Sequence, residues 1–161
     1  MRKALLLFLA TVCVACSEDQ SEYSTYHFFN NASIVTNDNP NFFLALIEGG
    51  NNLVFEYTYV LEADPEIADS GFSETLIFEI DPTLEEFSFS NNELESLNTY
   101  YRQICFCVNS ESILLNTGTI SGTKVNSNTW NISIYVSIPI SGNPTATPIQ
   151  LELSGLFSLE E

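Results

Sequence analysis

The most regular pattern in the chain is an alternation of apolar and polar positions over residues 129–138. Every second position there carries a large apolar side chain: Trp130, Ile132, Ile134, Val136 and Ile138. Because the side chains of a β-strand point alternately to its two faces, this pattern predicts a strand with one buried face. Residues 117–125 are its predicted hairpin partner, across a turn at residues 126–128.

Shorter strands are predicted along the rest of the chain. They fall at residues 26–29, 33–36, 42–48, 53–61, 75–80, 87–89, 100–108 and 149–157. Glycine and asparagine at 49–52 supply the positive φ angles of a tight turn, so the strands on either side are predicted to form a hairpin. One short helix is expected at 93–98, where Ser90, Asn91 or Asn92 can cap it. Many short strands about ten residues apart predict an all-β fold, either an antiparallel sandwich or a barrel-like meander.

The first 20 residues have a different pattern, which is typical of a secretory signal. Arg2 and Lys3 precede an apolar stretch at 4–14, and small residues lead from there to Cys16. A membrane-spanning helix needs about 20 apolar residues, so this stretch is expected to be cleaved off rather than kept as an anchor. The predicted organisation is a signal peptide, an acidic tether and one β domain: residues 1–15, 16–24 and 25–161.

The cysteine at the end of this signal resembles that of a bacterial lipobox, because it directly follows Val14 and Ala15. The resemblance implies that Cys16 is lipidated and that its acyl groups hold the mature chain in a membrane. Cys13 departs from the usual pattern, in which leucine stands at that position. The alternative is cleavage by the ordinary signal peptidase, which would leave a secreted protein.

Three polar residues follow this cysteine: Ser17, Glu18 and Asp19. They resemble the export signal of small Bacteroidota surface lipoproteins, and the last third of the chain looks like the terminal meander of such proteins at residues 118–122, 130–134 and 151–157. The resemblance implies an outer-membrane protein displayed on the cell surface, and it carries no known activity. The alternative is the periplasmic face of that membrane, with the acidic stretch acting as a plain disordered linker.

Charge limits the partners of the mature chain. Once the signal peptide is removed, Arg102 and Lys124 are the remaining cations against 21 acidic residues. Such a chain repels phosphates, so nucleic acid is excluded as a partner. An acidic surface attracts divalent cations or basic partners, and it also serves simply as a solvated coat.

One predicted loop places three carboxylates close together: Asp64, Glu66 and Asp69. Their spacing suits oxygen ligands of a calcium ion, although no EF-hand motif is present. Calcium there is a hypothesis. No cofactor is expected to be needed for folding, because a chain of this length can build a sufficient apolar core.

Cys105 and Cys107 are predicted to share one face of a strand. Residues two apart in a strand are about 6.5–7 Å apart at Cα, which is at the limit of disulfide reach, so two free thiols packed in the sheet are expected. The alternative is a labile redox pair or a site for a soft metal ion.

No catalytic motif stands out in the sequence. His27 is the one histidine of the chain, and nothing near it has the spacing of a triad or a zinc site. Tyr101 and Tyr135 are candidate stacking surfaces for sugar rings, although strand tyrosines also pack against their neighbours. We therefore expect a binding or structural module of the cell envelope, with a glycan or a protein as candidate ligand. The alternative is a glycosidase-like hydrolase, which would use paired carboxylates.

Overall fold

The computed structural model describes residues 21–37, 43–63, 70–105, 111–140 and 145–160. These residues form ten strands and one helix: β1 (Glu22–Thr36), β2 (Ala45–Gly49), β3 (Asn52–Leu61), β4 (Phe72–Ile80), β5 (Glu86–Ser90), α1 (Glu93–Ser96), β6 (Tyr100–Ile104), β7 (Ile113–Leu114), β8 (Gly118–Asn126), β9 (Thr129–Ile138) and β10 (Ile149–Leu159). The predicted all-β class and the short helix are both confirmed.

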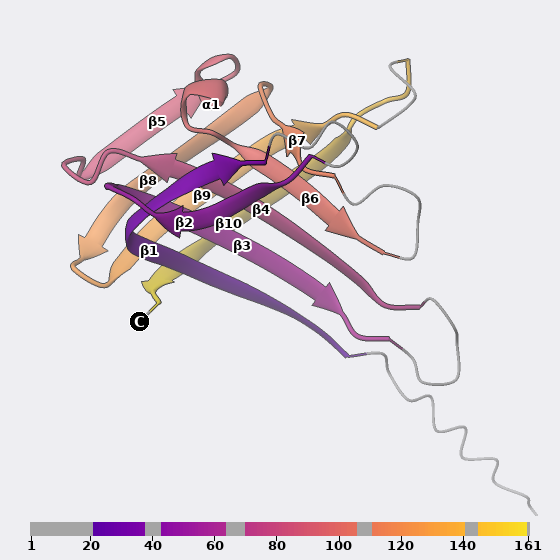
Figure 1. Cartoon of the computed structure of the whole chain (residues 1–161), viewed down its shortest axis with the longest axis horizontal. Helices are drawn as coiled ribbons and strands as arrows, with labels where there is room; N and C mark the ends of the chain where they lie inside the picture. The colour runs from indigo at the N-terminus through magenta and orange to yellow at the C-terminus, as the bar shows by residue number, and fades with distance from the viewer. Residues whose placement is uncertain (1–20, 38–42, 64–69, 106–110, 141–144, 161) are drawn as a thin grey trace, which may run out of the picture.

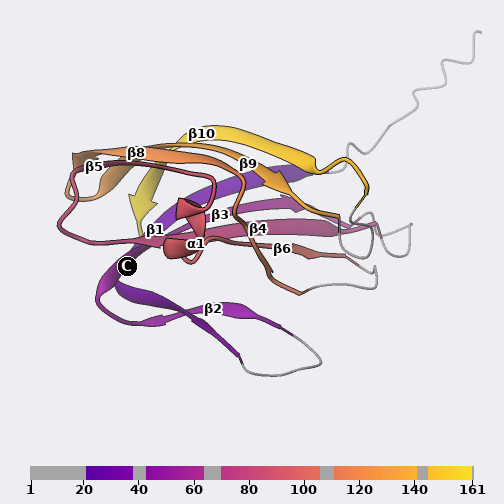
Figure 2. The same ribbon diagram turned by 90° about the horizontal axis from the view of Figure 1, so that it is seen from above.

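All ten strands belong to one sheet that curls into a half-barrel. The order is β5-β8-β9-β10-β1-β3-β4-β6-β7, and β2 pairs with β1 beside this path. Figure 2 shows β5, β8, β9 and β10 in one layer, with β3, β4 and β6 facing them across the interior. β10 joins the two layers, because it pairs with β9 in the antiparallel sense and with the middle of β1 in the parallel sense. The sheet is therefore mixed rather than wholly antiparallel.

The hairpin of β8 and β9 matches its prediction closely. β9 spans the predicted residues, and its register with β8 turns at Asn126 to Thr129 (Figure 1). The five alternating apolar side chains predicted to be buried are each at most 3% exposed. This part of the chain therefore folds as its local pattern indicates.

The interior of the half-barrel is packed with aromatic rings around Phe55 of β3. Its ring centroid lies 5.0 Å from that of Phe78 on β4, 5.6 Å from that of Trp130 on β9 and 5.8 Å from that of Phe157 on β10. Such offset and edge-to-face contacts are the favoured geometries of aromatic pairs. Leu94, at the centre of α1, is fully buried in the same core. The two layers therefore share one hydrophobic core.

The first strand is longer than predicted and it is bent. β1 begins at Glu22, three residues before the expected start of the β domain, and it runs through Asn30 and Asn31, where two separate strands were predicted. Its register with β3 shifts between Phe29 and Ala32, and Asn31 has a φ of 53°. Asparagine tolerates this left-handed conformation better than most residues, so the pair makes a bulge rather than a break.

The predicted hairpin of residues 42–48 and 53–61 is wrong. β2 and β3 both pair with β1, end to end: β3 with its first half and β2 with its second half. The Gly50 N–H donates to the Asn31 carbonyl oxygen at 2.8 Å, so the residues predicted to form the turn lie opposite the bulge. The chain does not reverse there, because β2 and β3 are both antiparallel to β1. The bulge bends the second half of β1 out of the main sheet, and β2 follows it.

We call residues 32–36 of β1 together with β2 the flap. Figure 2 shows it as a separate ribbon outside the layer of β3, β4 and β6. A second, smaller core joins the flap to the outer face of this layer: Ala32, Ile34, Ala45, Val54, Ile77 and Tyr100. One carboxylate also fastens it, since Glu79 on β4 accepts hydrogen bonds from the Ile34 N–H at 2.8 Å and from the Asn98 amide at 2.6 Å.

Candidate functional site

A pocket of about 380 Å³ lies between the flap and the outer face of the sheet. We call it the flap pocket. Much of its wall is apolar, with Phe29 of β1, Leu46 and Ile47 of β2, and Ile77 and Tyr100 of the sheet. Ligand sites of proteins are typically apolar clefts of this size order, with a few polar groups that fix orientation. This makes the flap pocket the candidate functional site.

Two oppositely charged side chains line this pocket from different strands. Glu56 stands on β3 and Arg102 on β6, with β4 between them. On β4, Thr75 is paired with Arg102 of β6, and Ile77, two residues further along, is paired with Glu56 of β3. The register of three strands thus places a carboxylate and a guanidinium in one apolar recess, each half-buried.

Glu56 belongs to a wider group of charges on this outer face. His27 of β1 is its partner in the β1–β3 register, and Nδ1 of His27 lies 2.7 Å from Oε2 of Glu160, without the alignment of a hydrogen bond. Burial raises the pKa of Glu56, against the opposing fields of His27 and Arg102, while Glu160 adds to the rise. Among these influences burial dominates, so the site disfavours the ionised form of Glu56.

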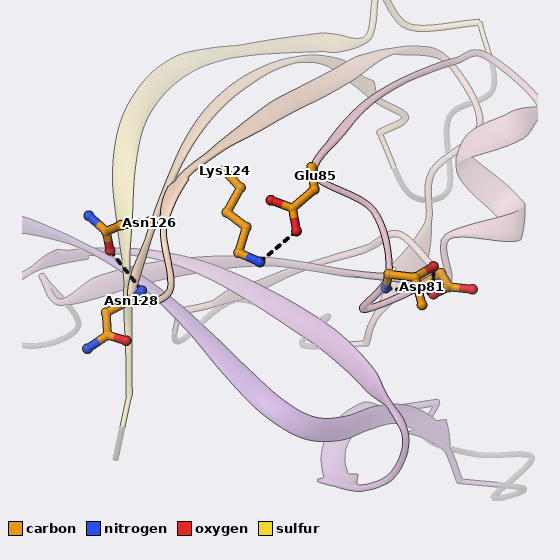
Figure 3. A network of polar contacts seen from close by, with 6 residues as sticks. Asp81, Glu85, Lys124, Asn126 and Asn128 are labelled. Carbon is orange, nitrogen blue, oxygen red and sulfur yellow. Dashed lines mark hydrogen bonds and ion pairs between the residues drawn. The ribbon is translucent and has the colours of Figure 1, made fainter.

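Among the described residues, the two side chains of lysine and arginine differ in their surroundings. Lys124 donates from Nζ to Oε1 of Glu85 at 2.9 Å, as Figure 3 shows. Arg102 makes no hydrogen bond or ion pair with any other described residue. A guanidinium carries five N–H donors in a rigid fork, and none of those of Arg102 is bonded within the described part of the chain.

Sequence reasoning did not single out Glu56 or Arg102 as a site. Each is a polar residue on the outward face of a strand whose other face is buried, which is the ordinary position of a solvated charge. The scarcity of cations was the one available signal, because an arginine within an otherwise apolar alternation in such an acidic chain is unusual. His27, near which the sequence shows no triad or zinc spacing, lies beside Glu56 and Glu160.

Several predicted site residues lie outside the described residues. These are the lipidation site Cys16, the export-signal residues Ser17, Glu18 and Asp19, and the calcium candidates Asp64, Glu66 and Asp69. Within the described part of the chain, no group of three or more metal-binding side chains gathers at one place. The helix described there is also too short to cross a membrane.

The expectation of two free thiols at Cys105 and Cys107 is wrong for the first of them. Cys105 is disulfide-bonded, and Cys107 lies outside the described residues. β6 ends at Ile104 and Cys105 stands in a bend, so the strand spacing used for the prediction does not apply. A redox role for the pair stays a prediction.

The two tyrosines proposed for sugar stacking differ in their exposure to solvent. Tyr101 is 4% exposed, and its hydroxyl donates to Glu74 at 2.8 Å inside the half-barrel, so its ring is not available to stack on a sugar. Burial raises the pKa of Tyr101 and keeps its hydroxyl protonated. Tyr135 is 49% exposed on the outer face of β9, next to a row of paired serines in which Ser133 and Ser154 are 2.9 Å apart. Glycan binding at this face stays a prediction.

Comparisons with protein-family models, with curated proteins and with solved structures find no match to this chain. Function is therefore inferred from the amino-terminal sequence and from the residues of the flap pocket.

Proposed function

We propose that the mature protein is a lipid-anchored binding protein of the cell envelope, held in the outer membrane through Cys16 and displayed on the cell surface. Its β domain binds a small ligand in the flap pocket. The observation that carries the binding role is an apolar pocket of about 380 Å³ lined by the Arg102 guanidinium, which has no hydrogen bond or ion pair with another described residue.

The amino-terminal sequence supports the anchor. The predicted signal peptide ends at Ala15, directly before Cys16, and β1 begins at Glu22, so a very short tether would connect the lipid to the sheet. A single acyl chain binds a membrane reversibly, while two or more hold a protein stably. A multiply acylated Cys16 would keep even this strongly acidic domain on an anionic surface.

The anchor is tested by cell fractionation of the full chain. Cys16→Ser is expected to abolish incorporation of labelled palmitate and to release the protein or stall its processing. Cys13→Ser, three residues earlier in the signal peptide, is the matched control and is expected to leave acylation intact. An acylated membrane protein recovered from Cys16→Ser would refute the anchor.

Surface display is tested separately, with protease added to intact cells. Changing Glu18 and Asp19 to Ala is expected to leave the protein acylated but to protect it from the protease. Equal cleavage of the variant and the wild type would remove the support for an acidic export signal, while the lipid anchor would stand.

The binding role is tested with a neutral apolar dye, N-phenyl-1-naphthylamine, whose fluorescence rises in apolar surroundings. Thr75→Phe places a ring in the flap pocket and is expected to abolish most of the saturable signal of the purified mature protein. Thr119→Phe, at an exposed position of β8, is the matched control and is expected to bind dye like the wild type. No saturable binding by the wild type, or equal binding by both variants, would refute the pocket as a ligand site.

A hydrolase is less well supported by this geometry. Glycosidases need two carboxyl groups facing each other across the substrate. Glu56 is the one carboxylate among the described residues that line the flap pocket, and an arginine stands opposite it.

A further inference from the structure

The charges of the flap pocket indicate what kind of ligand it takes. We propose that the pocket binds an amphipathic monocarboxylate, a molecule with an apolar body whose single carboxylate pairs with Arg102. This inference rests on the binding role proposed above. The apolar body would lie against the flap, and the carboxylate would lie toward β6.

The wall composition accounts for the apolar body. Leu46 of β2 lines the pocket and is 42% exposed, and Ile47 beside it is partly buried. Opposite them, Phe29, Ile77 and Tyr100 complete an apolar recess. An apolar chain or ring placed there would remove this surface from water, which is the main favourable contribution to binding in such a site.

The guanidinium accounts for the carboxylate. Arg102 is held by β6 in the pocket wall, and it has no hydrogen bond or ion pair with another described residue. A planar carboxylate can accept two parallel N–H bonds from such a fork, and these charge-assisted bonds are stronger than neutral ones. The apolar wall increases their strength, because it keeps the local dielectric low.

The acidic groups around the pocket favour a ligand with only one negative charge. Glu56 faces the same recess, Glu160 lies behind it beside His27, and the whole mature chain carries 21 acidic residues against two cations. A phosphate or a dicarboxylate would bring a second negative charge against one guanidinium, with no other cation lining the described part of the pocket. An anion with one charge and a large apolar body meets the least repulsion.

Glu56 gives this inference a distinctive test. If the ligand is an anion, Glu56 repels it, so removing the Glu56 charge should tighten binding. If the ligand is instead a zwitterion whose ammonium group pairs with Glu56, removing that charge should weaken binding. The same substitution therefore shifts the affinity in opposite directions for the two kinds of ligand.

The experiment is calorimetric titration of the purified mature protein with octanoate, its neutral isostere octanamide, and the zwitterion leucine. Octanoate is expected to bind more tightly than octanamide. Arg102→Gln is expected to weaken octanoate binding about 10- to 100-fold, which corresponds to the loss of a hydrogen-bonded charge pair. Glu56→Gln is expected to tighten octanoate binding about two- to five-fold, since it removes a nearby like charge. Octanamide carries no charge, so both substitutions should change its affinity less than they change the affinity for octanoate.

Arg102→Lys is the conservative control, which keeps the charge but loses the planar fork, and an intermediate affinity is expected from it. Equal affinity for octanoate and octanamide, or an Arg102→Gln variant that binds octanoate like the wild type, would overturn the proposal. Preference for leucine, with weaker binding by Glu56→Gln, would overturn it in favour of a zwitterion. The neutral dye tests the pocket independently of its charge. If the wild type binds the dye but does not prefer octanoate over octanamide, only this inference is refuted. If the wild type binds neither the dye nor octanoate, the binding role is refuted as well.

Discussion

Single residues on the outer face decide how the flap pocket is charged. Glu56 is buried enough that its ionised form is disfavoured, while the fields of His27 and Arg102 oppose that effect. Arg102 stands next to Thr75 rather than next to a carboxylate in the strand register, so no described carboxylate pairs with its guanidinium. The chemistry of the pocket therefore depends on which side chain faces which across the sheet.

The raised pKa of Glu56 leads to a pH-dependent prediction. The folded state holds the Glu56 proton more tightly than the unfolded chain, so the stability that Glu56 contributes is present at low pH and is lost as the pH rises through its folded-state pKa. Glu56→Gln keeps the shape without the charge. Its melting temperature is expected to equal that of the wild type near pH 4 and to exceed it at about pH 7–8. The measurement is thermal unfolding of both proteins across this range.

Glu152→Gln is the control for this prediction, because Glu152 is exposed on the outer face of β10. It is expected to show no comparable gain at neutral pH. A Glu56→Gln variant that is less stable than the wild type at neutral pH would mean that attraction to His27 and Arg102 outweighs burial.

A backbone position provides a second prediction at this scale. Gly118 at the start of β8 has a φ of 129°, and a Cβ there would overlap the Tyr135 carbonyl oxygen and lie 2.6 Å from the Cα of Val136. Gly118→Ala is therefore expected to lower the free energy of unfolding by about 1–3 kcal/mol, or more if the strand pair must separate. Gly49→Ala is the matched control, since a Cβ at Gly49 meets no atom within 4 Å. Urea denaturation measures both, and equal effects would contradict this account.

The flap is the element that makes the pocket. It exists because the bulge at Asn30 and Asn31 turns the second half of β1 away from the sheet, where β2 pairs with it. Its other end is held by Ser112, whose hydroxyl accepts a hydrogen bond from the Ala45 N–H at 3.0 Å. The flap therefore packs through a small apolar core and a few specific hydrogen bonds.

Loss of one of these bonds should loosen the flap. Glu79→Ala removes the carboxylate that accepts from the Ile34 N–H and from Asn98, and hydrogen bonds to charged groups contribute about 1.5–3 kcal/mol each. Faster hydrogen exchange is expected for β2 and for residues 32–36, with β8 and β9 unchanged. Glu152→Ala, on the far layer, serves as the control. Unchanged exchange in the flap would show that its apolar contacts alone hold it.

At the scale of the whole molecule, the half-barrel consists of two layers with one interior. The strand contact between them is short, since β1 and β10 are in register over two residue pairs, His27 with Ser158 and Phe28 with Leu159. The core is what unites the layers, because Phe55 of one layer packs on Trp130 and Phe157 of the other. The layers should therefore not be stable apart.

This shared core predicts that the domain unfolds as one cooperative unit. The single tryptophan, Trp130, reports on the layer of β8, β9 and β10, while far-ultraviolet circular dichroism reports on the strands of both layers. The two urea transitions are expected to coincide, as for a two-state domain. A tryptophan transition at a clearly different urea concentration would show that the layers unfold separately.

Local pattern determined part of this protein. The hairpin of β8 and β9 was predictable because its strands are neighbours in the chain, its turn is short, and Trp130 to Ile138 alternate without interruption. The short helix begins where its polar leading residues 90–92 predicted, although its N-cap, Asn92, makes no side-chain cap hydrogen bond. The secretory signal read from charge and apolar length in residues 1–20 stays a prediction. These features depend on residues close together in sequence, where propensity and periodicity act directly.

Tertiary structure decided the rest. Whether Asn30 and Asn31 end a strand or form a bulge depends on the pairing of β1 with β3, and local propensity does not determine this pairing. The flap exists because the two residues form a bulge. Glu56 and Arg102 are 46 positions apart in the chain, and they share a pocket because β4 aligns β3 with β6 in one particular register. A shift of one residue would move either side chain to the opposite face of the sheet, so the charge of the pocket is set by long-range pairing and not by the local pattern.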